Sequence, residues 1–180
     1  IGITAALVAL LLSAQAKADC SAIHALPMTM FVDRLAFTAA PQFWIDAFDG
    51  NNSALREALA KADADEKKKL LNLKFYSMSP LIAAAFNGQA HTVKLLLESG
   101  ADAKETTALS SMNAPGFRLD AGVAAIASPS YNRKRAQAVI QELTAKGYDL
   151  SLPTSAILLA PAYRRDLAML SWLLDRGASP

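Results

Sequence analysis

The chain of 180 residues is 53% hydrophobic and 19% charged, and its 18 basic and 16 acidic residues leave a formal net charge of +2. This composition excludes an intrinsically disordered chain, which would be poorer in apolar residues. It also argues against a general nucleic-acid-binding protein, which needs a stronger or more clustered basic excess. We therefore predict one domain with its own core and no nucleic-acid partner.

Residues 1–18 have the pattern of a secretory signal peptide. The apolar run from Ile1 to Leu12 is followed by Ala16, Lys17 and Ala18, which form an A-x-A cleavage site. The alternative is a membrane anchor, but the run is shorter than the roughly 20 apolar residues that a membrane span needs. We expect export, and no stable membrane insertion of the mature chain.

Cys20 is the only cysteine, so an internal disulfide is excluded. Asp19 precedes it, where a lipidated cysteine would follow a small residue. We interpret Cys20 as an unpaired thiol. The segment 19–42 is expected to cap the N-terminal end of the domain that follows.

Residues 43–60 predict two short helices joined by a turn at 49–52. Ser53 is the expected cap of the second helix. The expected inward residues of the two helices are Phe43, Trp44, Ala47 and Phe48, then Leu55, Ala58 and Leu59. Residues 61–78 form a charged extension with a basic triplet at 67–69. The triplet suits an acidic contact, but its mixed-sign surroundings favour a solvated helix face.

Residues 79–102 form the most regular stretch of the chain. Ser79 and Pro80 suit a helix start, and Gly88 breaks this first helix. A second helix carries apolar residues from Val93 to Leu97, and Gly100 suits the left-handed position after it. Two helices this short cannot bury their apolar faces alone, so neighbouring repeats must stack on them.

This stretch closely resembles the ankyrin repeat. The matching residues are Ser79-Pro80-Leu81-Ile82, Ala84-Ala85, Gly88, Val93-Lys94-Leu95-Leu96-Leu97 and Gly100-Ala101-Asp102. Ile82 replaces the family's histidine, so packing must replace its polar link between repeats. The resemblance implies an all-α solenoid of about four repeats, near 43–65, 79–102, 121–149 and 154–180, with an irregular first repeat and long inter-repeat loops.

The third and fourth repeats are less regular. A long loop is expected over 106–116, where Ser, Thr, Asn, Pro and Gly are frequent. Val139, Ile140 and Leu143 indicate the second helix of the third repeat, after a basic loop at 128–135. That loop suits an acidic surface or nucleic acid, although plain exposure is the more common case. The fourth repeat starts near Thr154.

The sequence contains no recognisable catalytic or metal-binding motif, and we predict a non-enzymatic protein without cofactor or metal. His24 and His91 are expected at the surface. One cysteine excludes a multi-cysteine zinc site.

The resemblance implies protein binding along a concave surface formed by loop tips and first-helix ends. Aromatic, Met and Arg side chains at these positions are typical of interface centres. The expected binding residues, including two from the basic loop, are Phe75, Tyr76, Met78, Phe86, Asn87, Phe117, Arg118, Asp120, Tyr131, Arg133, Tyr163 and Arg164. The alternative for Phe75 and Phe86 is packing against residues 61–78 or the N-terminal segment.

Export of a repeat domain without disulfides favours the bacterial periplasm. The leading hypothesis is an immunity-type inhibitor that binds and neutralises a toxic effector enzyme there. The alternative is a structural or stress-related accessory factor of a periplasmic complex.

Overall fold

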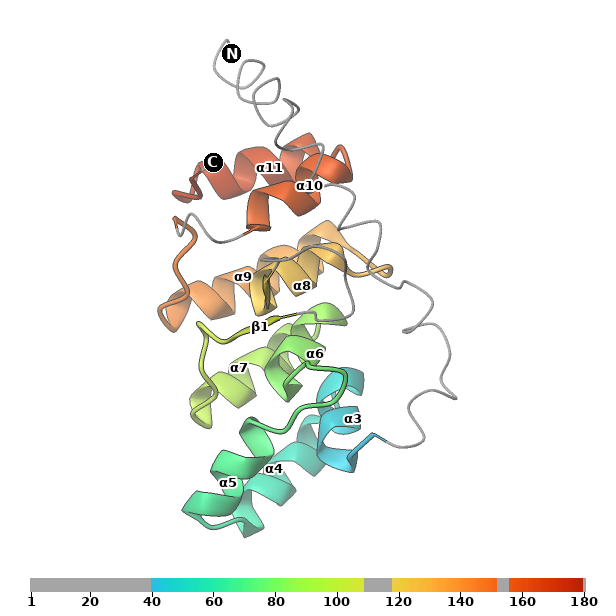
Figure 1. The fold of residues 1–180 in the computed structure, drawn as a ribbon, viewed down its shortest axis with the longest axis vertical. Coiled ribbons are helices and arrows are strands. Elements are labelled where there is room, and N and C mark those ends of the chain that lie inside the picture. Colours follow the sequence, from blue (N-terminus) through green and yellow to red (C-terminus); the bar gives the residue numbers. More distant parts are fainter. Residues whose placement is uncertain (1–39, 109–117, 152–155, 180) are drawn as a thin grey trace.

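Paired short helices make up most of the computed structural model, which describes residues 40–108, 118–151 and 156–179 (Figure 1). The first two pairs and the helix between them are α3 (Gln42–Asp49) with α4 (Asn52–Lys61), α5 (Ala64–Leu71), and α6 (Pro80–Phe86) with α7 (Ala90–Glu98). The next two pairs are α8 (Ala121–Ala127) with α9 (Arg133–Ala145), and α10 (Leu159–Tyr163) with α11 (Leu167–Leu174), the last preceded by the 3-10 turn η3 (Ala156–Leu158). The described chain is mostly helical, as predicted.

The pairs stack in sequence order (Figure 1). First helices contact first helices, so that α3 packs on α6, α6 on α8 and α8 on α10. Second helices contact second helices, α4 on α7 and α7 on α9. Contacts therefore run between neighbouring pairs, which is the arrangement of a solenoid.

Buried alanines are frequent in the first helices α6 and α8, and the second helices add larger apolar side chains to the core. Every residue of α6 and of α8 is buried. Alanine allows these helices to approach closely, while Leu96, Ile140 and Leu143 fill the space behind them with full burial. Ile82 is also fully buried, which agrees with the expectation that packing replaces the missing histidine.

Side-chain caps start most of the helices. Ser79, Asp120 and Asp166 accept hydrogen bonds from the backbone N–H groups of Ile82, Val123 and Met169. The expectation that Ser53 caps α4 is wrong. Asn51 caps it instead, through the N–H of Ala54, because the chain enters the helix one residue after Gly50.

The basic loop expected at 128–135 is shorter than predicted. Helix α9 begins at Arg133 because Asn132 caps it, accepting from the N–H of Arg135. The three basic residues therefore occupy the first turn of a helix, and only 128–132 form the connection.

A short antiparallel hairpin joins the second and third pairs. Its strands are β1 (Thr106–Ala108) and β2 (Arg118–Asp120), with Thr107 opposite Leu119. The sequence predicted a loop here, not strands. The remainder of that loop, the proposed signal peptide, Cys20, His24 and the capping segment up to residue 39 lie outside the described residues.

Candidate protein-binding surface

A tight turn at 75–78 precedes α6 and exposes an aromatic side chain. Phe75 and Met78 exchange two backbone hydrogen bonds of 3.0 Å, so Tyr76 and Ser77 form a two-residue turn. Both have positive φ, 47° for Tyr76 and 63° for Ser77. This backbone conformation is energetically costly for residues other than glycine. Tyr76 is 45% exposed at the tip, which is high for a tyrosine in a domain with so large a core.

Side chains of helix α3 contact this turn and support it. The indole Nε1 of Trp44 donates to the carbonyl of Met78 over 2.9 Å, and the indole is fully buried. The ring of Phe75 meets Trp44 edge-on at 5.2 Å and Tyr76 edge-on at 4.5 Å. Phe48 stacks on Trp44 at 5.6 Å. The strained turn is therefore fixed by an aromatic cluster of the preceding helix pair.

Several of the expected binding residues in the second pair serve the fold instead. Met78 and Phe86 are 1% and 6% exposed, so the expectation that they lie on a binding surface is wrong. Phe75 packs against the core, and its ring contacts Trp44 of α3, which neither the binding interpretation nor the alternative predicted. Asn87 donates from Nδ2 to the carbonyl of Phe48 over 2.8 Å and so links two helix pairs. Only Tyr76 remains prominently exposed in this group.

The hairpin base in front of α8 has one exposed and two buried residues. Arg118 is exposed and donates to Thr106 Oγ1 of the facing strand. Asp120 is 5% exposed, which contradicts its expected place on a binding surface. It caps α8 and accepts from the hydroxyl of Tyr148 over 2.8 Å. Phe117 lies outside the described residues.

An ion pair joins two successive connections. The ammonium of Lys74, just before the 75–78 turn, pairs with the carboxylate of Glu105, just before β1. Burial lowers the pKa of Lys74 below its ordinary value. The pair fixes the base of the hairpin relative to the 75–78 turn, and nothing in either sequence segment predicted it.

Four side chains connect the third and fourth pairs. The carboxylate of Asp166 accepts from the hydroxyl of Tyr131 and from Nε of Arg133, both over 2.9 Å. A second oxygen of Asp166 lies 2.7 Å from Arg133. The guanidinium of Arg164 lies 4.9 Å from the centre of the Tyr131 ring. It also donates to the carbonyls of Ile126 and Ala127 at the end of α8.

This network changes the expected roles of three residues. Tyr131, Arg133 and Arg164 were expected to contact a partner, but each uses its polar group inside the chain. The physical reason is that α8 ends without a cap of its own, and Arg164 supplies the missing donors. The carboxylate of Asp166 then holds the hydroxyl and guanidinium beside it.

The network shifts the pKa values of its members, among them Tyr131 and Asp166. Burial, followed by the hydrogen bond to Asp166, raises the pKa of Tyr131 to about 12. Burial favours the protonated form of Asp166, but hydrogen bonds from Arg133, the Met169 amide and Tyr131 outweigh it and hold its pKa below the ordinary value. The carboxylate is therefore charged at neutral pH.

The fourth pair presents one further aromatic residue. Tyr163 ends α10 and is 36% exposed. In the second pair, Phe86 ends α6 but is buried. Besides Arg133, which is paired with Asp166, three of the expected residues are exposed, and we call them the tip residues: Tyr76, Arg118 and Tyr163.

Comparison with protein families decides what kind of repeat this is. The matching segment starts at Tyr76, includes the turn, α6 and α7, and ends with β1. Residues 76–108 match the family model of the ankyrin repeat. No curated protein sequence matches the chain.

An ankyrin repeat is a protein-binding module and is generally not catalytic. Within the described ranges, no three His, Cys, Asp or Glu side chains gather as a metal site. No helix in the described part is long and apolar enough to cross a membrane.

Sequence reasoning missed the residues that act across the stack. Asp166, Tyr148 and Lys74 have partners 28 or more residues away or in another connection. Asp166 stands at a helix start, where an aspartate is typical, but Tyr148 and Lys74 follow no such local rule. Trp172, on α11, carried no signal of function either.

Proposed function

We propose that this chain is a non-catalytic protein-binding protein made of four ankyrin repeats, with the tip residues at the centre of its binding surface. The observation that carries the proposal is the turn at 75–78. It opens an ankyrin repeat, it is strained at two residues, and it exposes a tyrosine. Strained, exposed aromatic turns on a rigid support are typical of binding sites.

Stacking supports a common surface for Tyr76 and Arg118. Each lies in the connection that leads into a first helix, two or three residues before the capping residue. Helices α6 and α8 pack on one another, so their preceding connections follow the same side of the stack. Tyrosine and arginine are the types most often found at the energetic centre of an interface.

Support for four repeats comes from the recurring helix pairs. The second helices of the last three pairs are each followed by a glycine with positive φ: Gly100 at 102°, Gly147 at 89° and Gly177 at 92°. A first and a second helix also occur at 42–61, although the glycine there lies in the turn between them, at Gly50.

As a more specific proposal, the protein is an immunity-type inhibitor in the bacterial periplasm, where it blocks a toxic enzyme delivered into the cell envelope. The support is the apolar start with its A-x-A triplet and a small binding fold with irregular connections. An irregular hairpin and an exposed aromatic tip suit insertion into an enzyme's cleft.

A competition experiment tests the inhibitor proposal. Cells that lack the protein should lose survival against a toxin-producing sibling strain, and the full chain should restore it. A Tyr76→Ala chain should not restore survival. The matched control is Tyr148→Phe, which alters a buried tyrosine and should still protect. Equal survival with and without the protein would refute the inhibitor role.

Affinity purification from envelope extract separates the inhibitor from an accessory factor. Recovery of one stoichiometric toxin supports the inhibitor. Recovery of a resident envelope complex, lost in the Tyr76→Ala chain, supports the accessory role and keeps the binding proposal. Binding that survives alanine at all three tip residues contradicts the proposed surface itself.

A further inference from the structure

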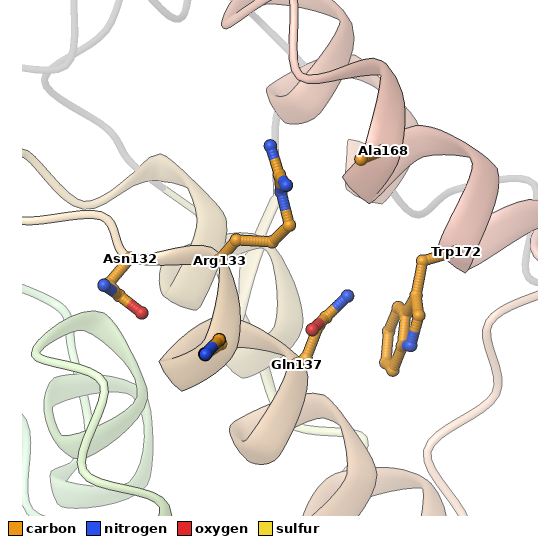
Figure 2. Close-up of a pocket in the computed structure, with 6 residues that line it drawn as sticks. Asn132, Arg133, Gln137, Ala168 and Trp172 are labelled. Atoms are coloured by element: carbon orange, nitrogen blue, oxygen red, sulfur yellow. The ribbon is translucent and has the colours of Figure 1, made fainter.

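A groove lies between the second helices of the third and fourth pairs and is lined by none of the tip residues. It has a volume of about 610 Å³ and is formed between the first turns of α9 and the middle of α11. Figure 2 shows the indole of Trp172 descending from α11 toward the amide of Gln137 on α9. Its lining residues are Asn132, Arg133, Lys134, Gln137, Ala168 and Trp172.

The groove wall formed by α11 is apolar where it faces outward. Its sequence is LAMLSWLL, and Leu167 is 62% exposed while Ala168 is exposed and Trp172 is half-buried. Surface helices of globular domains usually show a polar outer face. Apolar outer residues beside a groove therefore indicate a surface that another chain covers.

The opposite wall is positively charged. Arg133 and Lys134 are exposed in the first turn of α9. On the α11 side, Arg176 lies 4.0 Å over the ring of Trp172. One acid, Asp166, is paired with Arg133. Lys134 has no ion pair within the described residues, so a cation faces the groove beside an indole and an amide.

We infer that this groove binds an acidic peptide segment of a partner protein, independently of the tip residues. A carboxylate of the segment pairs with Lys134, an apolar side chain packs on Trp172 and Ala168, and the Gln137 amide bonds to the segment's backbone. Charge complementarity carries the choice of occupant.

The geometry favours an acidic peptide over a nucleic acid. Base stacking needs an open ring face, and Arg176 already covers one face of Trp172. The chain's net charge of +2 gives little general attraction for phosphates.

The two tryptophans allow a direct test by NMR. Trp172 lines the groove, while Trp44 is buried in the first pair and bonded to Met78, so its indole N–H is an internal reference. The probe is a peptide of glutamates with one leucine and one phenylalanine. Titration into the ¹⁵N-labelled chain should shift the Trp172 indole signal and leave that of Trp44 unchanged. A Trp172→Phe chain identifies the two signals.

Charge reversal supplies the matched comparison. Lys134→Glu should weaken the peptide at least about tenfold, because like charges would then meet in the groove. Lys69→Glu is the control, since Lys69 is an exposed lysine on α5 at the opposite end of the stack (Figure 1), and it should leave affinity unchanged. Tyr76→Ala should also leave it unchanged, which separates this groove from the tip residues.

Three results would overturn the inference. The first is an unmoved Trp172 signal at millimolar peptide. The second is an equal shift with a peptide in which glutamine replaces every glutamate. The third is a shift with an oligothymidylate but not with the acidic peptide, which would assign the groove to nucleic acid. Both lysines are exposed, and the dispersion of the remaining NMR signals shows that each variant is folded.

Discussion

Gly122 shows how one missing side chain permits a polar contact in the core. A Cβ atom added at this position would lie 2.5 Å from the hydroxyl oxygen and 2.8 Å from the ring carbon Cζ of Tyr148. The close approach brings that hydroxyl to Asp120, the cap of α8. The glycine is needed for space, since its φ is not in the left-handed region.

Gly122→Ala should lower the free energy of unfolding by about 1–3 kcal/mol, because the methyl group forces the Tyr148 ring away from α8. Tyr148→Phe should cost less, about 1 kcal/mol, since it removes one hydrogen bond and leaves the packing. Urea unfolding measures both. Tyr76→Phe is the control and should change little. An unchanged unfolding midpoint for Gly122→Ala would contradict the close approach.

Ser77 illustrates strain at a single residue. Its φ of 63° is costly for serine and ordinary for glycine. Ser77→Gly should therefore raise the free energy of unfolding by about 0.5–1 kcal/mol. Ser53→Gly, in the first turn of α4, should lower it by a similar amount because glycine weakens a helix. Thermal unfolding compares the two, and a loss of stability in both would show that the turn is not strained.

Residue patterns predicted the helix pairs where local rules decide the structure. Gly100 was recognisable because a helix end often needs a left-handed residue, and the structure repeats this at Gly147 and Gly177. The burial of Asp120 was not, because its partner Tyr148 lies 28 residues further along the chain, after the second helix of the same pair. Of the expected binding residues, those that act across the stack were misjudged for the same reason.

At the scale of elements, Asp166 joins one helix start to the preceding pair. It caps α11 through the Met169 N–H and accepts from Tyr131 and Arg133. Asparagine is itself a good cap, whereas alanine is not. Asp166→Asn therefore removes the charge and keeps the helix cap, whereas Asp166→Ala removes both.

Asp166→Ala should lower the free energy of unfolding by about 2–3 kcal/mol, and Asp166→Asn by about 1 kcal/mol. The folded-state pKa of Asp166 lies below the ordinary value of 3.8, so its charge stabilises the fold above that pH. This contribution is lost as the pH falls through the folded-state pKa. The stability gap between the parent chain and Asp166→Asn should thus persist from pH 7 to pH 5 and close toward pH 2. Urea unfolding at each pH measures it, and a constant gap would contradict the charge effect.

At the scale of the whole molecule, each helix pair is stabilised by hydrogen bonds to its neighbouring pair. Asn87 bonds to the carbonyl of Phe48, and Arg164 bonds to the carbonyls at the end of α8. Each link joins one pair to the next. A solenoid of this kind loses order from the pair whose link is cut.

Arg164→Ala should loosen the fourth pair selectively. Amide hydrogen exchange in α10 and α11 should become about tenfold faster, while exchange in α6 and α7 stays unchanged. The neighbouring Arg165→Ala is the control, because Arg165 is exposed and none of its side-chain hydrogen bonds is seen in the described structure. Uniform acceleration along the chain would instead indicate one cooperative unit.

Arg164 also has a consequence for the order in which the chain folds during synthesis. It follows Ile126, whose carbonyl it binds, by 38 residues. The ribosome therefore releases α8 well before the side chain that completes its end. Until α10 emerges, the carbonyls at that end depend on water, and the nascent third pair stays open to chaperones and proteases. During synthesis, the carbonyl groups at the end of α8 therefore gain their protein hydrogen-bond donor only after the fourth pair has left the ribosome.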